Sequence, residues 1–210
     1  MAGWNLKAGA ITEYVVSEDR IWSLFNFVFS DACKKRNTYK FGLIKSLLDS
    51  AFSGEMTEQG VRYSYEELFG RFAYNYWNLV VKYDLRQMRK DGKSEFSKIE
   101  LIFKDVIKEN NIFINLEFES LGADIKNKII KQVTVECKRF VIGALYDDFD
   151  GIIYSFNLKE DGIVLNPRVY DFMLKYKSLR KESKVVQTKK QYGDFSLTAL
   201  SFASISIFSG

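Results

Sequence analysis

The chain has 210 residues and a mass of 24.4 kDa, and its 47% hydrophobic and 16% aromatic residues make it too apolar for a disordered protein. Its 31 basic and 27 acidic side chains give a net charge of +4, a mild excess that points to a nucleic-acid partner only where the charge is segregated. The sequence contains no histidine. This absence excludes Ser-His-Asp and Cys-His catalysis, as well as zinc sites and nucleases that depend on histidine.

Apolar periodicity predicts three helices in the first part of the chain. Ser17 is placed to cap the first helix, and Thr38 is placed to cap the second. Residues 53–62 are interpreted as a loop. Ser64 and Glu67 then have the spacing of a capping box, which predicts the start of the most regular helix in the sequence.

The middle of the chain predicts two more helices. The Asp-Gly pair within residues 84–94 interrupts the helical pattern. A helix is expected after Ser94, and the pair Asn110-Asn111 is expected to end it. One long helix is predicted from about Gly122 to Tyr146.

The pattern changes after the long helix. Residues 152–158 and 163–165 are β-prone runs separated by an Asp-Gly turn, which is typical of a hairpin. Asn166-Pro167 has the composition of a helix start. We therefore expect a mainly α protein of about six helices in one domain, with a small β-hairpin near residues 152–165.

The last part of the sequence differs in character from the rest. Residues 195–210 carry no charge and are β-prone, which makes this stretch an aggregation hazard unless it is buried. The expected organisation is a helical domain over residues 1–179 and an atypical C-terminal tail over residues 180–210. The tail is interpreted either as a docked strand or as the product of an altered reading frame.

Positive charge is concentrated in short segments with few acids, above all residues 34–40 and 82–98. Lysine and arginine supply the phosphate contacts that dominate affinity for nucleic acids. These segments therefore predict weak, non-specific binding of DNA, with solvated loops as the alternative interpretation. The candidate nucleic-acid-binding residues are Lys34, Lys35, Arg36, Arg86, Arg89 and Lys90.

A metal-dependent nuclease is a second hypothesis. Glu136 and Lys138 form an E-x-K triplet, and Asp124 lies upstream of it; on a strand, such groups hold Mg²⁺ and stabilise an attacking water. The acids of residues 147–150 are interpreted as turn residues rather than as a cation site. No cofactor and no bound metal are otherwise expected.

Targeting signals and membrane spans are not evident in the sequence, which predicts a cytoplasmic protein with no membrane partner. Cys33 and Cys137 stand alone, without a CxxC pattern. They are interpreted as reduced thiols rather than as a disulfide framework.

Roughly residues 30–179 resemble the N-terminal part of a family of bacterial HNH endonuclease proteins. The resemblance is carried by Thr38–Leu48 (TYKFGLIKSLL), Phe69–Val81 (FGRFAYNYWNLVV), Leu85-x-Gln87 and Ile142–Tyr176. In that family, this region precedes a small nuclease module whose histidines and cysteines bind the metal that cleaves DNA. The similarity stops near Leu179, and no catalytic residue can be carried over to a chain without histidine.

The function that the sequence favours is the non-catalytic, DNA-associated region of an HNH-type endonuclease-like protein. Two alternatives stay open. One is the metal-dependent nuclease that uses Asp124, Glu136 and Lys138. The other is a protein-interaction or oligomerisation module, whose partner is a second copy or another protein.

Overall fold

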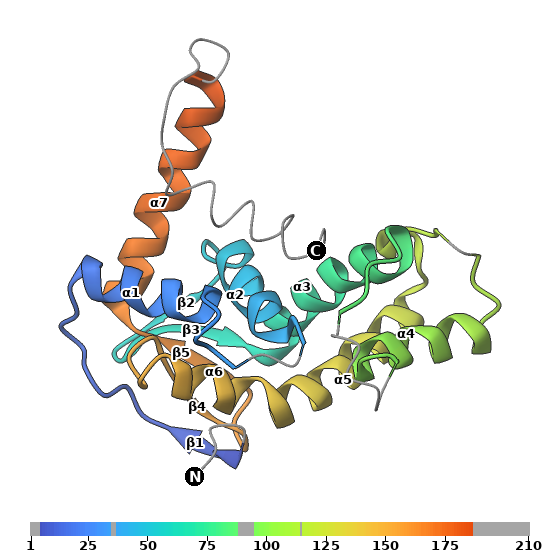
Figure 1. The fold of residues 1–210 in the computed structure, drawn as a ribbon, viewed down its shortest axis with the longest axis horizontal. Helices are drawn as coiled ribbons and strands as arrows, with labels where there is room; N and C mark the ends of the chain where they lie inside the picture. Colours follow the sequence, from blue (N-terminus) through green and yellow to red (C-terminus); the bar gives the residue numbers. More distant parts are fainter. Residues whose placement is uncertain (1–4, 35–36, 88–94, 114, 187–210) are drawn as a thin grey trace.

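The chain folds as a mixed α/β structure of helices and a five-stranded antiparallel sheet (Figure 1). The computed structural model describes residues 5–34, 37–87, 95–113 and 115–186, and all elements named below lie in these ranges. The helices are α1 (Glu18–Phe29), α2 (Tyr39–Asp49), α3 (Tyr65–Trp77), α4 (Lys98–Glu109), α5 (Ala123–Phe140), α6 (Ile142–Asp148) and α7 (Pro167–Val186), with a π-helix, η2 (Asn78–Lys82), and a 3₁₀-helix, η3 (Phe118–Ser120). The strands are β1 (Ala8–Gly9), β2 (Glu55–Thr57), β3 (Gly60–Ser64), β4 (Tyr154–Asn157) and β5 (Gly162–Leu165).

The predicted hairpin is confirmed as β4 and β5, but it is the centre of a larger sheet in the order β1-β4-β5-β3-β2. The expectation of a helix-rich fold is confirmed, but the strands form a five-stranded sheet instead of one small hairpin, so the fold is mixed α/β. Residues 53–62, interpreted as a loop, contain β2 and the start of β3. In β3, Val61 and Tyr63 are the only buried hydrophobic side chains, so its alternation is too short to identify a strand from sequence.

Several predicted helix boundaries are confirmed. The Ser17 side chain accepts a hydrogen bond from the backbone N–H of Arg20 at 3.2 Å, as expected for the cap of α1. Asn166 caps α7 in the same way by accepting from the N–H of Arg168 at 3.0 Å. Asn110 is the C-cap of α4, as the Asn-Asn pair indicated.

Other boundaries differ from the prediction. The long helix expected over residues 122–146 is divided into α5 and α6 at Val141, whose φ of −110° departs from helical geometry. Helix α7 continues to Val186, beyond the expected border between domain and tail at residues 179–180. The uncharged run 195–210 lies outside the described residues.

The capping box expected at the start of α3 is half formed. Ser64 accepts from the N–H of Glu67 at 3.1 Å, but the Glu67 carboxylate accepts from the Ser53 hydroxyl instead of reaching back to the cap. The complete capping box lies at α4, between Ser97 and Glu100. That helix starts three residues later than the sequence suggested.

Aromatic side chains from α3 form the centre of the helical part of the core. The Phe72 and Tyr76 rings stack with their centroids 4.2 Å apart, and both are buried. Trp77 is fully buried, and its ring meets Phe103 of α4 edge-on at 5.4 Å. The Trp77 indole N–H also donates to the carbonyl of Leu116 at 2.8 Å, which fixes the loop after α4 against the end of α3.

The helices form two groups that α5 connects. Figure 1 shows α3, α4 and one end of α5 on one side, and the sheet with α1, α6 and α7 on the other. Cys33 and Cys137 are both buried, and neither forms a disulfide bond. Among the described residues, no helix has the length and apolar character that crossing a membrane requires.

We expect Gly162→Ala to lower the free energy of unfolding by about 1–3 kcal/mol. A Cβ atom at this position would lie 2.3 Å from the backbone oxygen of Tyr63, across the β3–β5 ladder, where neither strand can yield without losing pairing. Urea denaturation measures the change.

Gly70→Ala in α3 is the matched control. Its Cβ would meet only the Cδ1 of Ile130 at 3.7 Å, so the substitution should stabilise the helix by about 0.5–1 kcal/mol. Equal stability of the two variants would show that the β3–β5 register is not as described.

Candidate nucleic-acid interface

The two basic segments singled out in the sequence meet where Thr38 contacts Gln87. The backbone N–H of Thr38 donates to the carbonyl of Gln87 at 3.1 Å, and the Thr38 hydroxyl donates to the Gln87 side-chain oxygen at 2.7 Å. Thr38 lies in the segment 34–40, and Gln87 lies next to Arg86. The fold therefore joins stretches that are about fifty residues apart in the chain.

A tyrosine completes the Thr38 contact. The Tyr76 hydroxyl lies 2.7 Å from the Thr38 oxygen, and since the Thr38 proton goes to Gln87, Tyr76 is the donor in this pair. Burial raises the pKa of Tyr76 well above its ordinary value, so the phenol keeps its proton at any physiological pH. The side chain of Thr38 therefore links the end of α3 to Gln87 rather than capping α2, for which the sequence had suggested it.

A buried carboxylate extends this network to α4. Glu100 is only 2% exposed, and its two oxygens accept from the backbone N–H groups of Ser97 at 2.6 Å and Gln87 at 3.4 Å. The charge also lies in the first turn of α4, where the helix dipole favours an anion. The N–H of Ile99 donates to the Tyr39 hydroxyl at 2.9 Å, so the start of α2 is tied to the start of α4 as well.

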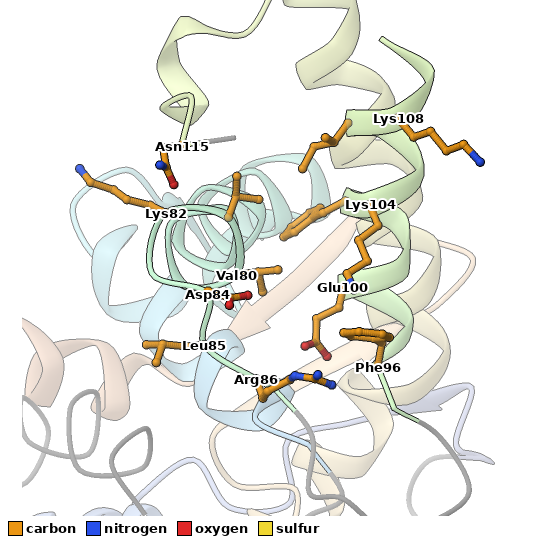
Figure 2. A pocket seen from close by; sticks show the side chains of 13 residues that line it. Val80, Lys82, Asp84, Leu85, Arg86, Phe96, Glu100, Lys104, Lys108 and Asn115 are labelled. Atoms are coloured by element: carbon orange, nitrogen blue, oxygen red, sulfur yellow. The ribbon is translucent and has the colours of Figure 1, made fainter. Parts of the chain in front are cut away.

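A cleft of about 460 Å³ lies between α4 and the segment that contains η2 and residues 83–86 (Figure 2). Its floor is apolar and is formed by Val80, Val81, Leu85, Phe96, Phe103 and Ile107. Its polar lining residues are Lys82, Asp84, Arg86, Glu100, Lys104, Lys108 and Asn115. Four cations against two carboxylates leave the lining with a net positive charge.

The cations at the cleft have weak intramolecular partners. Lys82 forms an ion pair with Glu117 at 3.1 Å, which raises the lysine pKa, and Arg86 forms one with Glu95 at 3.0 Å. These side chains are 40–68% exposed, and pairs of this kind contribute only about 0–1 kcal/mol. An incoming phosphate can therefore replace the carboxylate partners at little cost.

The backbone around the cleft has two unusual features. The π-helix η2 forms one wall, and single turns of this kind are frequent at functional sites. Asp84 and Asn115, both lining residues, have φ angles of 49° and 79°, in the left-handed region that asparagine and aspartate tolerate best among residues with a side chain.

The structure brings one predicted DNA-binding residue, Arg86, to the cleft and leaves Lys34 exposed at the end of the loop after α1. The other four, Lys35, Arg36, Arg89 and Lys90, lie outside the described residues. Lys40 of the same basic segment serves the fold instead. Its ammonium lies 2.5 Å from the Asp148 carboxylate, with only 15% and 17% of the two side chains exposed.

Sequence reasoning missed Lys104 and Lys108. They are exposed on successive turns of α4, and Figure 2 shows the Lys104 side chain directed toward Phe96, whereas that of Lys108 points away from the cleft. Their four-residue spacing within an amphipathic helix is the signal that could have identified this cationic face.

The three residues of the metal-dependent alternative lie on one helix, α5, and not on a strand. Asp124 and Glu136 are about 18 Å apart along the axis, because a helix rises about 1.5 Å per residue. Glu136 and Lys138 point about 200° apart around it. No group of three histidine, cysteine, aspartate or glutamate residues that could hold a metal ion occurs within the described part of the chain.

Lys138 and two acids of the 147–150 segment contact other side chains of the fold. The Lys138 ammonium lies 4.5 Å from the centre of the Tyr65 ring. In the 147–150 segment, Asp148 pairs with Lys40, and Asp150 pairs with Arg20 at 2.6 Å. Asp148 is therefore held in a largely buried ion pair with α2, whereas Asp150 pairs with α1 and stays 60% exposed.

Comparisons with known proteins found no matching family model, no matching curated protein and no matching solved structure.

We expect Thr38→Val to lower the free energy of unfolding by about 1–3 kcal/mol, because it leaves the buried Gln87 oxygen without a donor and Tyr76 without an acceptor. Thr57→Val is the matched control. It removes a similar 2.8 Å bond to the carbonyl of Gly60 at an exposed strand position, and should change stability by less than about 0.5 kcal/mol. Chemical denaturation compares the two, and equal losses would argue against the junction.

Glu136→Gln should raise the denaturation midpoint at pH 7. Burial raises the Glu136 pKa, against the smaller opposing effects of Lys98 and Arg139. An acid with a raised folded-state pKa binds protons more tightly in the folded protein, so its ionisation destabilises the fold as pH rises. The gain should therefore shrink as pH falls from the raised folded-state pKa toward the ordinary carboxyl pKa of 4.5, below which it is lost. A loss of stability at pH 7 would contradict this assignment.

Proposed function

We propose that this chain is a DNA-binding module without catalytic chemistry of its own, equivalent to the DNA-associated region of an HNH-type endonuclease-like protein. The observation that carries the proposal is the Thr38–Gln87 junction, which joins the two basic segments beside a cleft lined by four cations. A sequence-independent electrostatic contact of this kind requires clustered lysine and arginine and no defined active site.

The charge arrangement supports phosphate binding. Arg86 and Lys104 lie on opposite walls of the cleft, one on the segment after η2 and the other on α4, and both are exposed. Their side chains are long, so they can reach phosphates at different positions of a flexible DNA backbone. Lys82 and Lys108 extend the positive surface on either side (Figure 2).

Two sequence features support the same proposal. Roughly residues 30–179 resemble the region that precedes the nuclease module in HNH endonuclease proteins, and Gln87 of the junction belongs to one of the segments that carry the resemblance. The absence of histidine makes the chemistry of that nuclease module impossible within this chain. The described geometry of Asp124, Glu136 and Lys138 gives no support to the metal-dependent alternative.

The chain should bind a duplex of any sequence with dissociation constants of roughly 10⁻⁴–10⁻⁶ M at physiological salt. If roughly four to six phosphates are neutralised, log K should fall against log salt with a slope of about −4 to −5. Arg86→Glu, Lys104→Glu and Lys108→Glu combined should weaken binding equally on every sequence and flatten that slope. Fluorescence anisotropy at several salt concentrations measures both quantities.

A second triple variant, Lys7→Glu, Lys131→Glu and Lys159→Glu, makes the same change in net charge at exposed lysines that do not line the cleft. It should reduce affinity far less. Equal losses in the two triple variants, or no binding at about 50 mM salt, would contradict the proposed interface. Cleavage with Mg²⁺, Mn²⁺ or Zn²⁺ that Glu136→Ala abolishes would contradict the non-catalytic assignment.

A further inference from the structure

The cleft has features that binding to the outside of a duplex does not use. Duplex DNA presents phosphates on its surface and keeps its bases stacked inside, so it cannot fill a cavity with an apolar floor. We propose that the cleft binds unpaired nucleotides of single-stranded DNA, with a base stacked on Phe96 and the flanking phosphates on Arg86 and Lys104. This inference rests on the proposed function and names the form of DNA that the cleft takes.

The size and lining of the cleft fit a base with its sugar. Its volume of about 460 Å³ lies within the range of about 300–1,000 Å³ typical of small-ligand sites. Apolar side chains from η2 and from α4 form its floor, as a planar, weakly hydrated base requires. Proteins that bind single strands combine aromatic platforms of this kind with a cationic groove.

Phe96 is the aromatic platform. The ring is half-buried at the cleft, with the Lys104 ammonium 3.0 Å and the Arg86 guanidinium carbon 4.3 Å from its centre. Both cations are attracted to the electron-rich face of the ring, and a base can stack on an aromatic face of the same kind. The exposed Lys104 side chain is flexible, so it can move from the ring to a phosphate while a base takes its place.

Two carboxylates line the cleft, and the exposed one, Asp84, affects where the phosphates of a bound DNA strand can lie. Figure 2 shows the Asp84 carboxylate on the wall opposite Lys104. Asp84 repels phosphates and can accept hydrogen bonds from base amino groups, whereas Lys104 attracts phosphates. The phosphates are therefore expected near Arg86 and Lys104 rather than near Asp84, with Lys108 meeting the next phosphate outside the cleft.

Two exposed aromatic side chains lie close in sequence to residues that line the cleft. Tyr83 is 60% exposed and lies between the lining residues Lys82 and Asp84. Phe113 is 85% exposed and lies two residues before Asn115. Large apolar groups left in water beside a cationic cleft are what neighbouring bases of a single strand would cover.

The test compares three fluorescent probes with the full-length chain: an oligothymidylate, an abasic strand of the same length and charge, and a duplex. Stacking contributes about 1–3 kcal/mol per base, so the oligothymidylate should bind at least about fivefold tighter than the abasic strand. Phe96→Leu should remove that difference without weakening binding of the abasic strand or the duplex. Phe96→Trp should retain it, and Phe52→Leu, at an exposed aromatic that does not line the cleft, should leave all three affinities unchanged.

Equal affinity of the unmodified chain for the oligothymidylate and the abasic strand would overturn the inference, and this comparison holds even if Phe96→Leu does not fold. In that case, salt-dependent duplex binding would leave the proposed function standing. Failure of all three probes to bind at about 50 mM salt would instead remove the proposed function itself. An oligouridylate that binds more than about tenfold tighter than the oligothymidylate would overturn the assignment to DNA.

Discussion

The buried Glu100 carboxylate is the constraint on which the candidate interface depends. A charge that is almost fully removed from water is costly unless hydrogen bonds compensate it, and here backbone N–H groups of Ser97 and Gln87 do so. Residues 83–87 form no regular secondary structure, so these bonds and the contact with Thr38 decide where that segment lies. Arg86 and one wall of the cleft are positioned as a consequence.

This arrangement divides the basic residues by role. Lys40 forms a largely buried ion pair that holds α2 against α6, although it lies in a segment whose positive charge had suggested DNA binding. Arg86, Lys104 and Lys108 are exposed. Arg86 pairs with Glu95 at the surface, and Lys104 lies over the Phe96 ring. A run of lysine and arginine therefore identifies a cationic surface only when the residues that form buried ion pairs within the fold are left out.

Much of the fold was predictable because the apolar periodicity of long amphipathic helices is visible in the sequence. The helix α3 has an apolar repeat along its whole length, and α1 and α7 begin at capping residues that are recognisable in the sequence. The sheet was not predictable beyond its hairpin, since β1 has two residues and β2 three exposed ones. The division between α5 and α6 at Val141 was not predictable either, because no glycine or proline stands at the break itself. The site was predictable only in part: Arg86 could be selected from its charge, but no local signal places Gln87 beside Thr38, or Lys104 over Phe96.

The central claim is that the Glu100 network preforms a cleft that DNA then occupies, and residue-resolved amide hydrogen exchange tests it most directly. In the free chain, the N–H groups of Thr38, Ser97 and Ile99 should exchange as slowly as those of the β3–β5 ladder, because each has a partner in the network or next to it. Added oligothymidylate should further slow exchange around Arg86 and the first turns of α4. Fast exchange of the three amides in the free chain, or no change around Arg86 with DNA bound, would contradict the account.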